Sequence, residues 1–188
     1  SRRQRQMCIR DSVLSVRNEC KELLFVVERE ADGREPSVRC INFGLDGMQS
    51  FSFTLEEERS AVLVPAGQVG TYLYEPNASV LKAGAFKQIA VRTGVKKLQV
   101  NSHLYTADHL VSDFPGRRFR VDEVLSFTGK LCKGLSKTIP QANITVRNFP
   151  LSVEELRKRT KITDGGHVYL FATTLVDGEK VLVKCSKA

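Results

Sequence analysis

VYLFATTLVDGEKVLVKC, residues 168–185, carries the clearest secondary-structure signal in this sequence. Two runs rich in β-branched and aromatic residues, Val168–Leu175 and Lys180–Cys185, flank the step Asp177-Gly178. An Asp-Gly step between such runs is the strongest short sequence signal for a β-hairpin, because glycine readily adopts the positive φ of a tight turn. The stretch therefore predicts an antiparallel pair of strands at this end of the chain.

Upstream of this hairpin, the second half of the chain alternates between helix and strand patterns. Apolar spacing predicts helices over 76–92 and 127–137, strands over 118–125 and 144–147, and a further helix that opens with the capping-box pattern Ser152-Val153-Glu154-Glu155. Asp164-Gly165-Gly166 ends this last helix. Residues 95–113 predict only short strands or loop. The alternation favours helices packed on a mixed sheet.

The first half of the chain is dominated by strand patterns. Runs at 13–16, 22–28, 38–43 and 51–55 predict an antiparallel meander with turns at 31–36 and 45–47. A helix over 18–30 is the alternative for the second run, because Asn18 is a good N-cap. The Pro- and Gly-containing segment 65–70 interrupts the pattern. We therefore predict an α+β fold with two domains, a small antiparallel β-rich domain over 1–70 and an α/β domain over 71–188.

The composition is that of an ordinary globular protein of 188 residues, with 41% hydrophobic and 27% charged residues. The longest apolar run, Leu23–Val27, is far shorter than the roughly 20 residues of a membrane span, so no membrane partner is expected. Five cysteines without a C-x-x-C pair argue against a disulfide framework or a zinc site. These features predict reduced thiols and a cytoplasmic location.

Sequence motifs for catalysis are missing from this chain. It has no G-x-G-x-x-G, P-loop, H-E-x-x-H or G-x-S-x-G pattern. The histidines at 103, 109 and 167 are not spaced as metal ligands. We therefore predict no catalytic residue, no metal site and no cofactor site within these residues, and leave open whether the parent protein is an enzyme.

The positive charge lies in the second half of the chain. Residues 1–70 carry 10 Lys+Arg and 11 Asp+Glu, whereas residues 71–188 carry 19 Lys+Arg and 10 Asp+Glu. This asymmetry favours an anionic partner, because clustered cations neutralise successive phosphates and release counterions. The candidate RNA-binding residues are Arg117, Arg118, Arg120, Lys130, Lys133, Lys137, Arg147, Arg157, Lys158, Arg159 and Lys161.

Each basic cluster also has a purely structural interpretation. Arg118 and Arg120 can flank a buried Phe119, the lysines at 130, 133 and 137 can form a solvated helix face, and the basic residues late in the last helix suit its dipole. Aromatic residues make up 7% and Trp is absent, which argues against stacking of single-stranded bases. The expected partner is therefore structured RNA, either tRNA or rRNA, recognised by its shape and backbone.

Several motifs carry a resemblance to a known family. They are Tyr72-Leu73-Tyr74-Glu75-Pro76-Asn77, Leu81-Lys82-Ala83-Gly84, Phe114-Pro115-Gly116-Arg117-Arg118-Phe119, Val146-Arg147-Asn148-Phe149-Pro150, Glu155-Leu156-Arg157-Lys158-Arg159 and Asp164-Gly165-Gly166. Over 71–188 they resemble the THUMP-like domain that closes a family of bacterial class I S-adenosylmethionine-dependent methyltransferases. Residues 1–70, with Asn18-Glu19-Cys20-Lys21-Glu22-Leu23, resemble the ferredoxin-like domain of that family.

The resemblance implies an RNA-modification setting. It implies that S-adenosylmethionine and the catalytic domain belong to a part of the parent protein that this chain lacks, and that this region binds and positions RNA. The alternative is a structural module that packs on the catalytic domain or dimerises without binding nucleic acid. Its candidate contact residues are Tyr72, Tyr74, Glu75, Pro76 and Asn77, although the two tyrosines can equally cap the core.

Overall fold

The computed structural model of the chain describes residues 8–28, 35–45 and 47–188. These residues form two compact units that are interleaved in sequence. Unit 1 comprises the described part of Ser1–Leu63 together with Pro76–Thr93 and Asp113–Arg117. Unit 2 comprises Val64–Glu75, Gly94–Ser112 and Arg118–Ala188. This division differs from the predicted boundary at residue 70, because the chain passes between the two units several times.

Unit 1 contains a four-stranded sheet in the order β2-β1-β3-β4. Its strands are β1 (Cys8–Val16), β2 (Glu19–Glu28), β3 (Ser37–Gly44) and β4 (Gly47–Thr54). The predicted strands are confirmed, but the meander is wrong, because β1 lies between β2 and β3 and runs parallel to β3. The buried side chains of Val13 and Cys40 meet in this central pair. The predicted turns at 31–36 and 45–47 include residues outside the described ranges.

The turn between β1 and β2 decides whether residues 18–30 form a strand or a helix. Asn18 has a φ of 64° there and does not cap a helix of its own. Its side-chain Oδ1 instead accepts a hydrogen bond of 2.8 Å from the backbone N–H of Ala78. Residues 19–28 are therefore a strand, and the helix alternative is wrong.

Three short helices complete unit 1: α1 (Leu55–Ser60), α2 (Ala78–Ala83) and α3 (Gln88–Thr93). The single helix predicted over 76–92 is wrong, because Gly84 adopts a φ of 79° and ends α2. Pro76 closes the preceding strand, and Asn77 is the N-cap of α2. Helix α1 was not predicted. Its N-cap is Thr54 and its first residue is Leu55, inside the pattern that suggested a strand, because Thr54 and Glu57 form a capping box.

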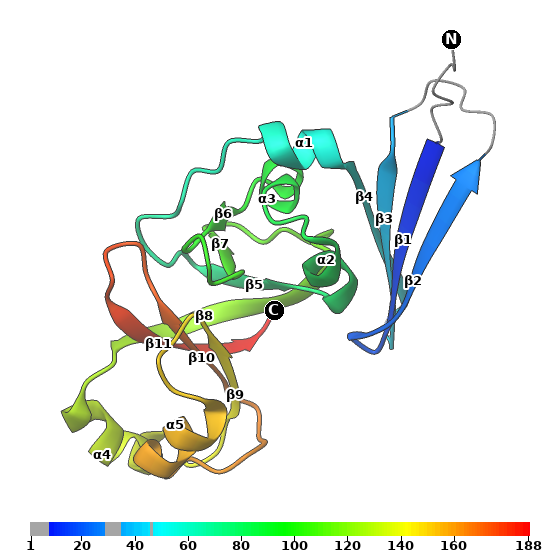
Figure 1. Ribbon diagram of the computed structural model, residues 1–188. Coiled ribbons are helices and arrows are strands. Elements are labelled where there is room, and N and C mark those ends of the chain that lie inside the picture. Colours follow the sequence, from blue (N-terminus) through cyan, green and yellow to red (C-terminus); the bar gives the residue numbers. More distant parts are fainter. Residues whose placement is uncertain (1–7, 29–34, 46) are drawn as a thin grey trace. The chain divides into compact units, whose positions relative to one another are not determined.

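Unit 2 is built on a seven-stranded mixed sheet in the order β6-β7-β5-β8-β11-β10-β9 (Figure 1). The strands are β5 (Tyr72–Pro76), β6 (Lys96–Lys97), β7 (Tyr105–Ala107), β8 (Gly116–Ser126), β9 (Asn143–Arg147), β10 (Tyr169–Thr174) and β11 (Lys180–Lys187). Its helices are α4 (Gly129–Thr138) and α5 (Val153–Thr160). The predicted α+β class, the mixed sheet with its helices and the final β10–β11 hairpin are confirmed.

The unit 2 sheet is buried on both faces. Leu170 and Ala172 of β10 pack with Leu182 of β11 under α4 and α5. The alternate residues, including Phe171 and Val183, pack into a second core on the opposite face. Strands buried on both faces are apolar almost throughout, which explains why the stretch 168–185 does not alternate with polar residues.

The unit 2 sheet is also strongly curled. Strands β5 and β9 have β8, β11 and β10 between them, which would separate them by about 19 Å in a flat sheet. Nevertheless, the Arg147 guanidinium Nη2 in β9 lies 3.0 Å from Glu75 Oε1 in β5. Curling therefore bends the sheet around the second core, and this ion pair joins the edge strand β9 to β5, the third strand from the opposite edge.

Candidate nucleic-acid interface

Helix α4 presents a row of lysines to solvent. The hydroxyl of its N-cap, Thr128, accepts a hydrogen bond from the N–H of Leu131. One face of the helix buries Cys132 and Leu135, which pack toward the sheet. Lys130, Lys133 and Lys137 are exposed, as the sequence spacing predicts.

Helix α5 adds a second row of cations. Ser152 and Glu155 form the predicted capping box, and the hydrogen bond from the Ser152 N–H lowers the pKa of Glu155. Leu156 and Thr160 are buried against the sheet. The exposed cations of this segment are Lys158, Arg159 and Lys161.

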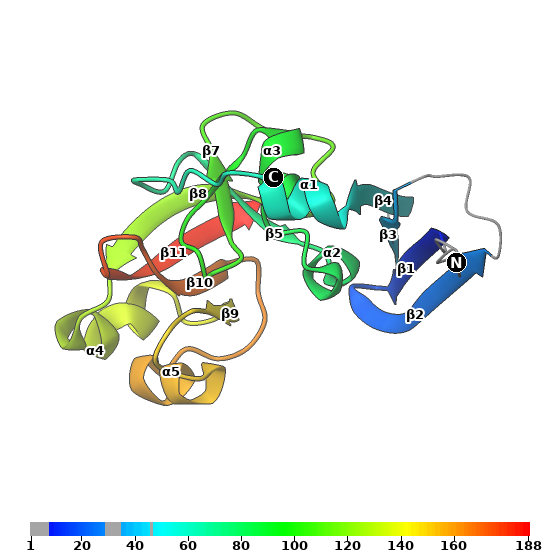
Figure 2. The ribbon, with the colours of Figure 1, turned by 45° about the horizontal axis from the view of Figure 1, so that its top comes forward.

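Helices α4 and α5 form a single layer. They contact one another and lie side by side over the same face of the sheet (Figure 2). Burial raises the pKa of the Cys132 thiol in α4, and the positive charge of Arg159 in α5 acts in the opposite direction. The structure therefore brings two predicted clusters together. We call this set the basic layer: Lys130, Lys133, Lys137, Lys158, Arg159 and Lys161.

Two other predicted RNA-binding residues have partners inside the chain. Arg157 donates to the carbonyls of Ala142 (3.2 Å) and Ile162 (3.3 Å) and forms an ion pair with Asp164. Arg147 donates from Nε and Nη2 to Glu75 Oε1, at 3.3 and 3.0 Å. Through these contacts both arginines stabilise the fold. We therefore leave Arg147 and Arg157 out of the basic layer.

The predicted cluster around Phe119 is divided. Phe119 is 1% exposed and packs into the second core, so Arg118 and Arg120 lie on the opposite side of β8. Arg118 donates to the carbonyl of Ser112, whereas Arg120 is exposed. Arg117 is exposed but belongs to unit 1. The structural interpretation of this cluster, arginines flanking a buried Phe, therefore describes Arg118 and Arg120.

The segment 72–77, predicted as a domain-contact surface, is mostly buried. Tyr74, Glu75 and Asn77 are at most 3% exposed, Pro76 is also buried, and Tyr72 is half-buried. The Tyr74 hydroxyl donates to the His109 carbonyl and accepts from the Val111 N–H, both at 2.9 Å, and burial raises its pKa. The segment is thus part of the core, which is a correction to the predicted contact.

A buried polar cluster that the sequence did not predict lies beside this segment. Lys97 is 3% exposed, donates to the Val100 carbonyl at 2.6 Å and lies 5.9 Å from the ring centre of Tyr105. The pKa of His103 is lowered to about 4, first by burial and then by the charges of Lys97 and Arg147. No motif marks this cluster, because folding alone brings its members together.

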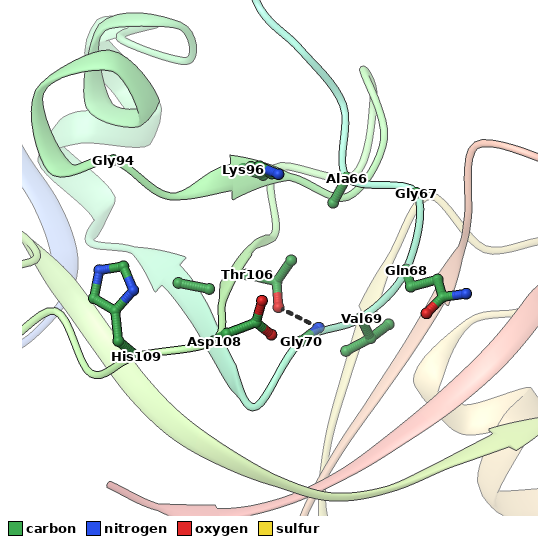
Figure 3. A pocket seen from close by; sticks show the side chains of 11 residues that line it. Ala66, Gly67, Gln68, Val69, Gly70, Gly94, Lys96, Thr106, Asp108 and His109 are labelled. Carbon is green, nitrogen blue, oxygen red and sulfur yellow. Dashed lines mark hydrogen bonds between the residues drawn. The ribbon is translucent and has the colours of Figure 1, made fainter.

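Unit 2 also contains a pocket with a cavity volume of about 310 Å³ (Figure 3). Its wall includes 66–70, the segment that sequence suggested as a domain boundary. The Gly70 N–H donates to Thr106 Oγ1 at 2.8 Å, and a Cβ at Gly70 would lie 2.6 Å from Asp108 Oδ1. Glycine is therefore required for this close approach. Lys96, Asp108 and His109 supply the charged and titratable groups of the wall.

The described residues offer neither a metal site nor a membrane-spanning helix. Within the described ranges, no group of three or more His, Cys, Asp or Glu side chains is placed to hold a metal ion. Among the helices of the same residues, none has the length and apolar character to cross a membrane.

Family comparisons assign two domains to the chain. Residues 72–115 match a ferredoxin-like domain, and residues 116–187 match a THUMP domain-like model. Both domain types are those that the sequence motifs suggested. The ferredoxin-like match lies at 72–115, whereas the sequence placed it over 1–70, and strands β1–β4 precede both matches. The whole basic layer lies within the THUMP-like match.

A solved structure is similar over nearly the whole chain. It is the crystal structure of a protein from Porphyromonas gingivalis W83 named "putative methyltransferase". It shares 41% sequence identity with this chain and superposes with a TM-score of 0.89. The match covers 98% of this chain but 47% of that one, so the chain spans about half the length of this relative. A search of curated proteins found no match.

Proposed function

We propose that this chain, in which a ferredoxin-like domain is followed by a THUMP-like domain, is the RNA-binding region of a methyltransferase that acts on structured RNA. The observation that carries the proposal is the basic layer, in which five exposed cations lie on two packed helices and the sixth, Lys161, caps α5, all within the THUMP-like domain. The related methyltransferase-named structure supports the reaction class. In this proposal S-adenosylmethionine supplies the methyl group and binds elsewhere in the parent protein, in the cytoplasm.

The physical role of the region is to hold RNA close to the reacting centre. Cations on adjacent helices can contact successive phosphates without reading the bases, which suits recognition of tRNA or rRNA by shape. Once RNA is held, methyl transfer becomes a local event, because the two reactants no longer have to meet by diffusion. Both α4 and α5 are anchored on a sheet core, so the backbone positions that carry the cations are fixed relative to one another.

The test is fluorescence anisotropy of the chain with labelled tRNA, an rRNA hairpin and duplex DNA at several salt concentrations. We expect tighter binding to structured RNA, weakening linearly in log salt. The variant K133E/K137E should lower affinity about tenfold or more and make the salt slope shallower by about two. The matched control K21E/K82E changes the net charge equally at exposed lysines outside the basic layer and should retain most of the affinity.

Three outcomes would contradict the proposal. Equal binding to all three nucleic acids would show generic attraction to polyanions. Equal losses in K133E/K137E and K21E/K82E would show that net charge, and not the basic layer, sets affinity. Absence of binding at low salt would favour the second candidate, a structural module, for which a different surface provides the observation below.

A further inference from the structure

Within the described part of the chain, the four-stranded sheet of unit 1 has one face covered by helices and one apolar face that no other element covers. Its covered face carries buried residues such as Val13, Cys40 and Phe51, and helix α2 packs on its strands. The Arg92 guanidinium of α3 lies 5.6 Å from the Phe51 ring centre, which places α3 on the same side. Because side chains alternate along a strand, the neighbouring residues point to the other face.

Apolar side chains gather on that other face. Val16, Phe43 and Met48 occupy one row across β1, β3 and β4, and they are 41%, 44% and 59% exposed. Leu24 and Val26 of β2 point the same way and are 46% and 47% exposed. We call these five residues the apolar sheet face. The half-buried Leu14 and Ile41 lie between them in the register and make the patch continuous.

Strand β2 extends this apolar surface to the edge of the sheet. It pairs with β1 on one side, and among the described residues its outer edge has no partner strand. Leu23 and Phe25 are also 47% and 67% exposed, so four consecutive large apolar residues face solvent. Proteins normally protect such edges by charge, bulges or a covering segment, because an exposed apolar edge strand promotes aggregation.

We propose that the apolar sheet face and the edge of β2 are the docking surface for the rest of the parent protein. The relative from Porphyromonas gingivalis has more than half of its chain outside the matched region, which supplies a covering partner of sufficient size. Strands β1–β4 lie outside both domain matches, so no assigned domain accounts for this face. A covalently joined partner is also present at high effective concentration.

This docking requires only that a longer parent protein exists, and it does not depend on RNA binding. The register places the exposed Glu22 and Arg39 on this same face, so it carries charges of both signs, whereas the basic layer is uniformly positive. A patch of exposed apolar residues of this kind marks protein–protein contact more often than nucleic-acid contact. The basic layer lies in unit 2 and is a separate surface in sequence and chemistry.

Hydrogen–deuterium exchange, measured without RNA, tests this inference on the full-length protein and on the 188-residue chain. We expect the β2 amides to exchange about tenfold or more slowly in the full-length protein, because docking covers that edge. Leu24→Glu and Met48→Glu should each restore fast exchange there and leave exchange in the 188-residue chain unchanged. Val62→Glu is the matched control, because Val62 is 82% exposed and lies outside the patch. This variant should leave the exchange of β2 unchanged in both the full-length protein and the 188-residue chain.

Equal exchange of β2 in the two proteins would overturn the proposal. Slow exchange already present in the 188-residue chain would overturn it as well, because the face would then be covered without the rest of the protein. Light scattering provides the remaining check. If the 188-residue chain is a dimer that Leu24→Glu dissociates, the occupant is a second copy, and the proposed partner is wrong.

Discussion

Among single residues, the partly buried ion pair between Arg147 and Glu75 makes a prediction about the stability of unit 2. Its carboxylate side is 3% exposed and its guanidinium side 35% exposed. We predict that Arg147→Met lowers the free energy of unfolding by about 2–3 kcal/mol, because it removes a partner from a buried carboxylate. The double variant R147M/E75Q should recover part of this loss. Urea unfolding of both variants measures the effect, and a loss below about 0.5 kcal/mol would contradict it.

His103 makes a prediction about pH. Its pKa is about 4 in the folded protein, against an ordinary value of 6.5, because burial and nearby cations disfavour the imidazolium. The unfolded chain therefore binds more protons between these values, and the free energy of unfolding should fall as pH decreases from about 6.5 to 4. His103→Asn tolerates the φ of 51° and should remove this part of the fall.

The comparison of the two proteins isolates the histidine. Urea titrations at pH 7, 6, 5 and 4 give the stability difference between wild type and His103→Asn, and other titrating groups cancel in that difference. As pH decreases, the free energy of unfolding of the wild type should fall relative to that of His103→Asn. A constant difference would show that His103 does not control the acid response.

These residue contacts also mark what sequence could not predict. Arg147 is a reasonable phosphate ligand by composition, and Glu75 is a reasonable surface acid beside Pro76. Only the curling of the sheet brings them together from positions 72 residues apart. The same holds for Lys97 and His103, whose environment depends on burial that no local pattern encodes.

At the scale of elements, one glycine in a helix and one in a turn with positive φ should respond in opposite directions to substitution by alanine. Gly134 lies inside α4 and Gly178 in the β10–β11 turn with a φ of 86°, and a Cβ at either would meet no atom within 4 Å. Gly134→Ala should stabilise the protein by about 0.5–1 kcal/mol, because alanine favours the helix. Gly178→Ala should destabilise it by about 1 kcal/mol, because alanine disfavours positive φ. Thermal unfolding that moves both variants in the same direction would contradict this account.

Local signals predicted the elements that local chemistry controls. The Asp177-Gly178 turn and the Ser152–Glu155 capping box appear where the sequence places them. The predicted helix and strand boundaries are wrong where one residue type is compatible with two local structures. Gly84 is tolerable within a helix but adopts the left-handed conformation that ends α2, and Thr54 continues a strand pattern but caps α1.

At the scale of the whole molecule, the sequence predicted the fold class and much of the candidate interface. The spacing of lysines on α4 and of basic residues on α5 placed both rows on exposed helix faces. It did not show that the helices pack together, nor that β1 and β3 are parallel. Such features depend on strand order, which is set by long-range pairing. The interleaving of the two units has the same origin.

That interleaving predicts how the molecule unfolds. Neither unit is a continuous stretch of chain, so segments of each unit are joined to one another through segments of the other. Cys40 reports on unit 1 and Cys185 on unit 2, and burial raises the pKa of each thiol to about 12. Both should therefore resist alkylation in the native state, since the thiolate is the reactive form. The half-exposed Cys20 serves as the internal control for the reagent.

We predict that Cys40 and Cys185 are alkylated at the same rate across a urea series, because both become reactive only through one cooperative unfolding event. Mass spectrometry of the separated peptides measures each rate, while Cys20 should react early and with little dependence on urea. Faster alkylation of Cys40 than of Cys185 would show that the four-stranded sheet opens by itself. In that case unit 1, which carries the apolar sheet face, would have low stability by itself. Docking of the rest of the protein should then slow the alkylation of Cys40 but not that of Cys185.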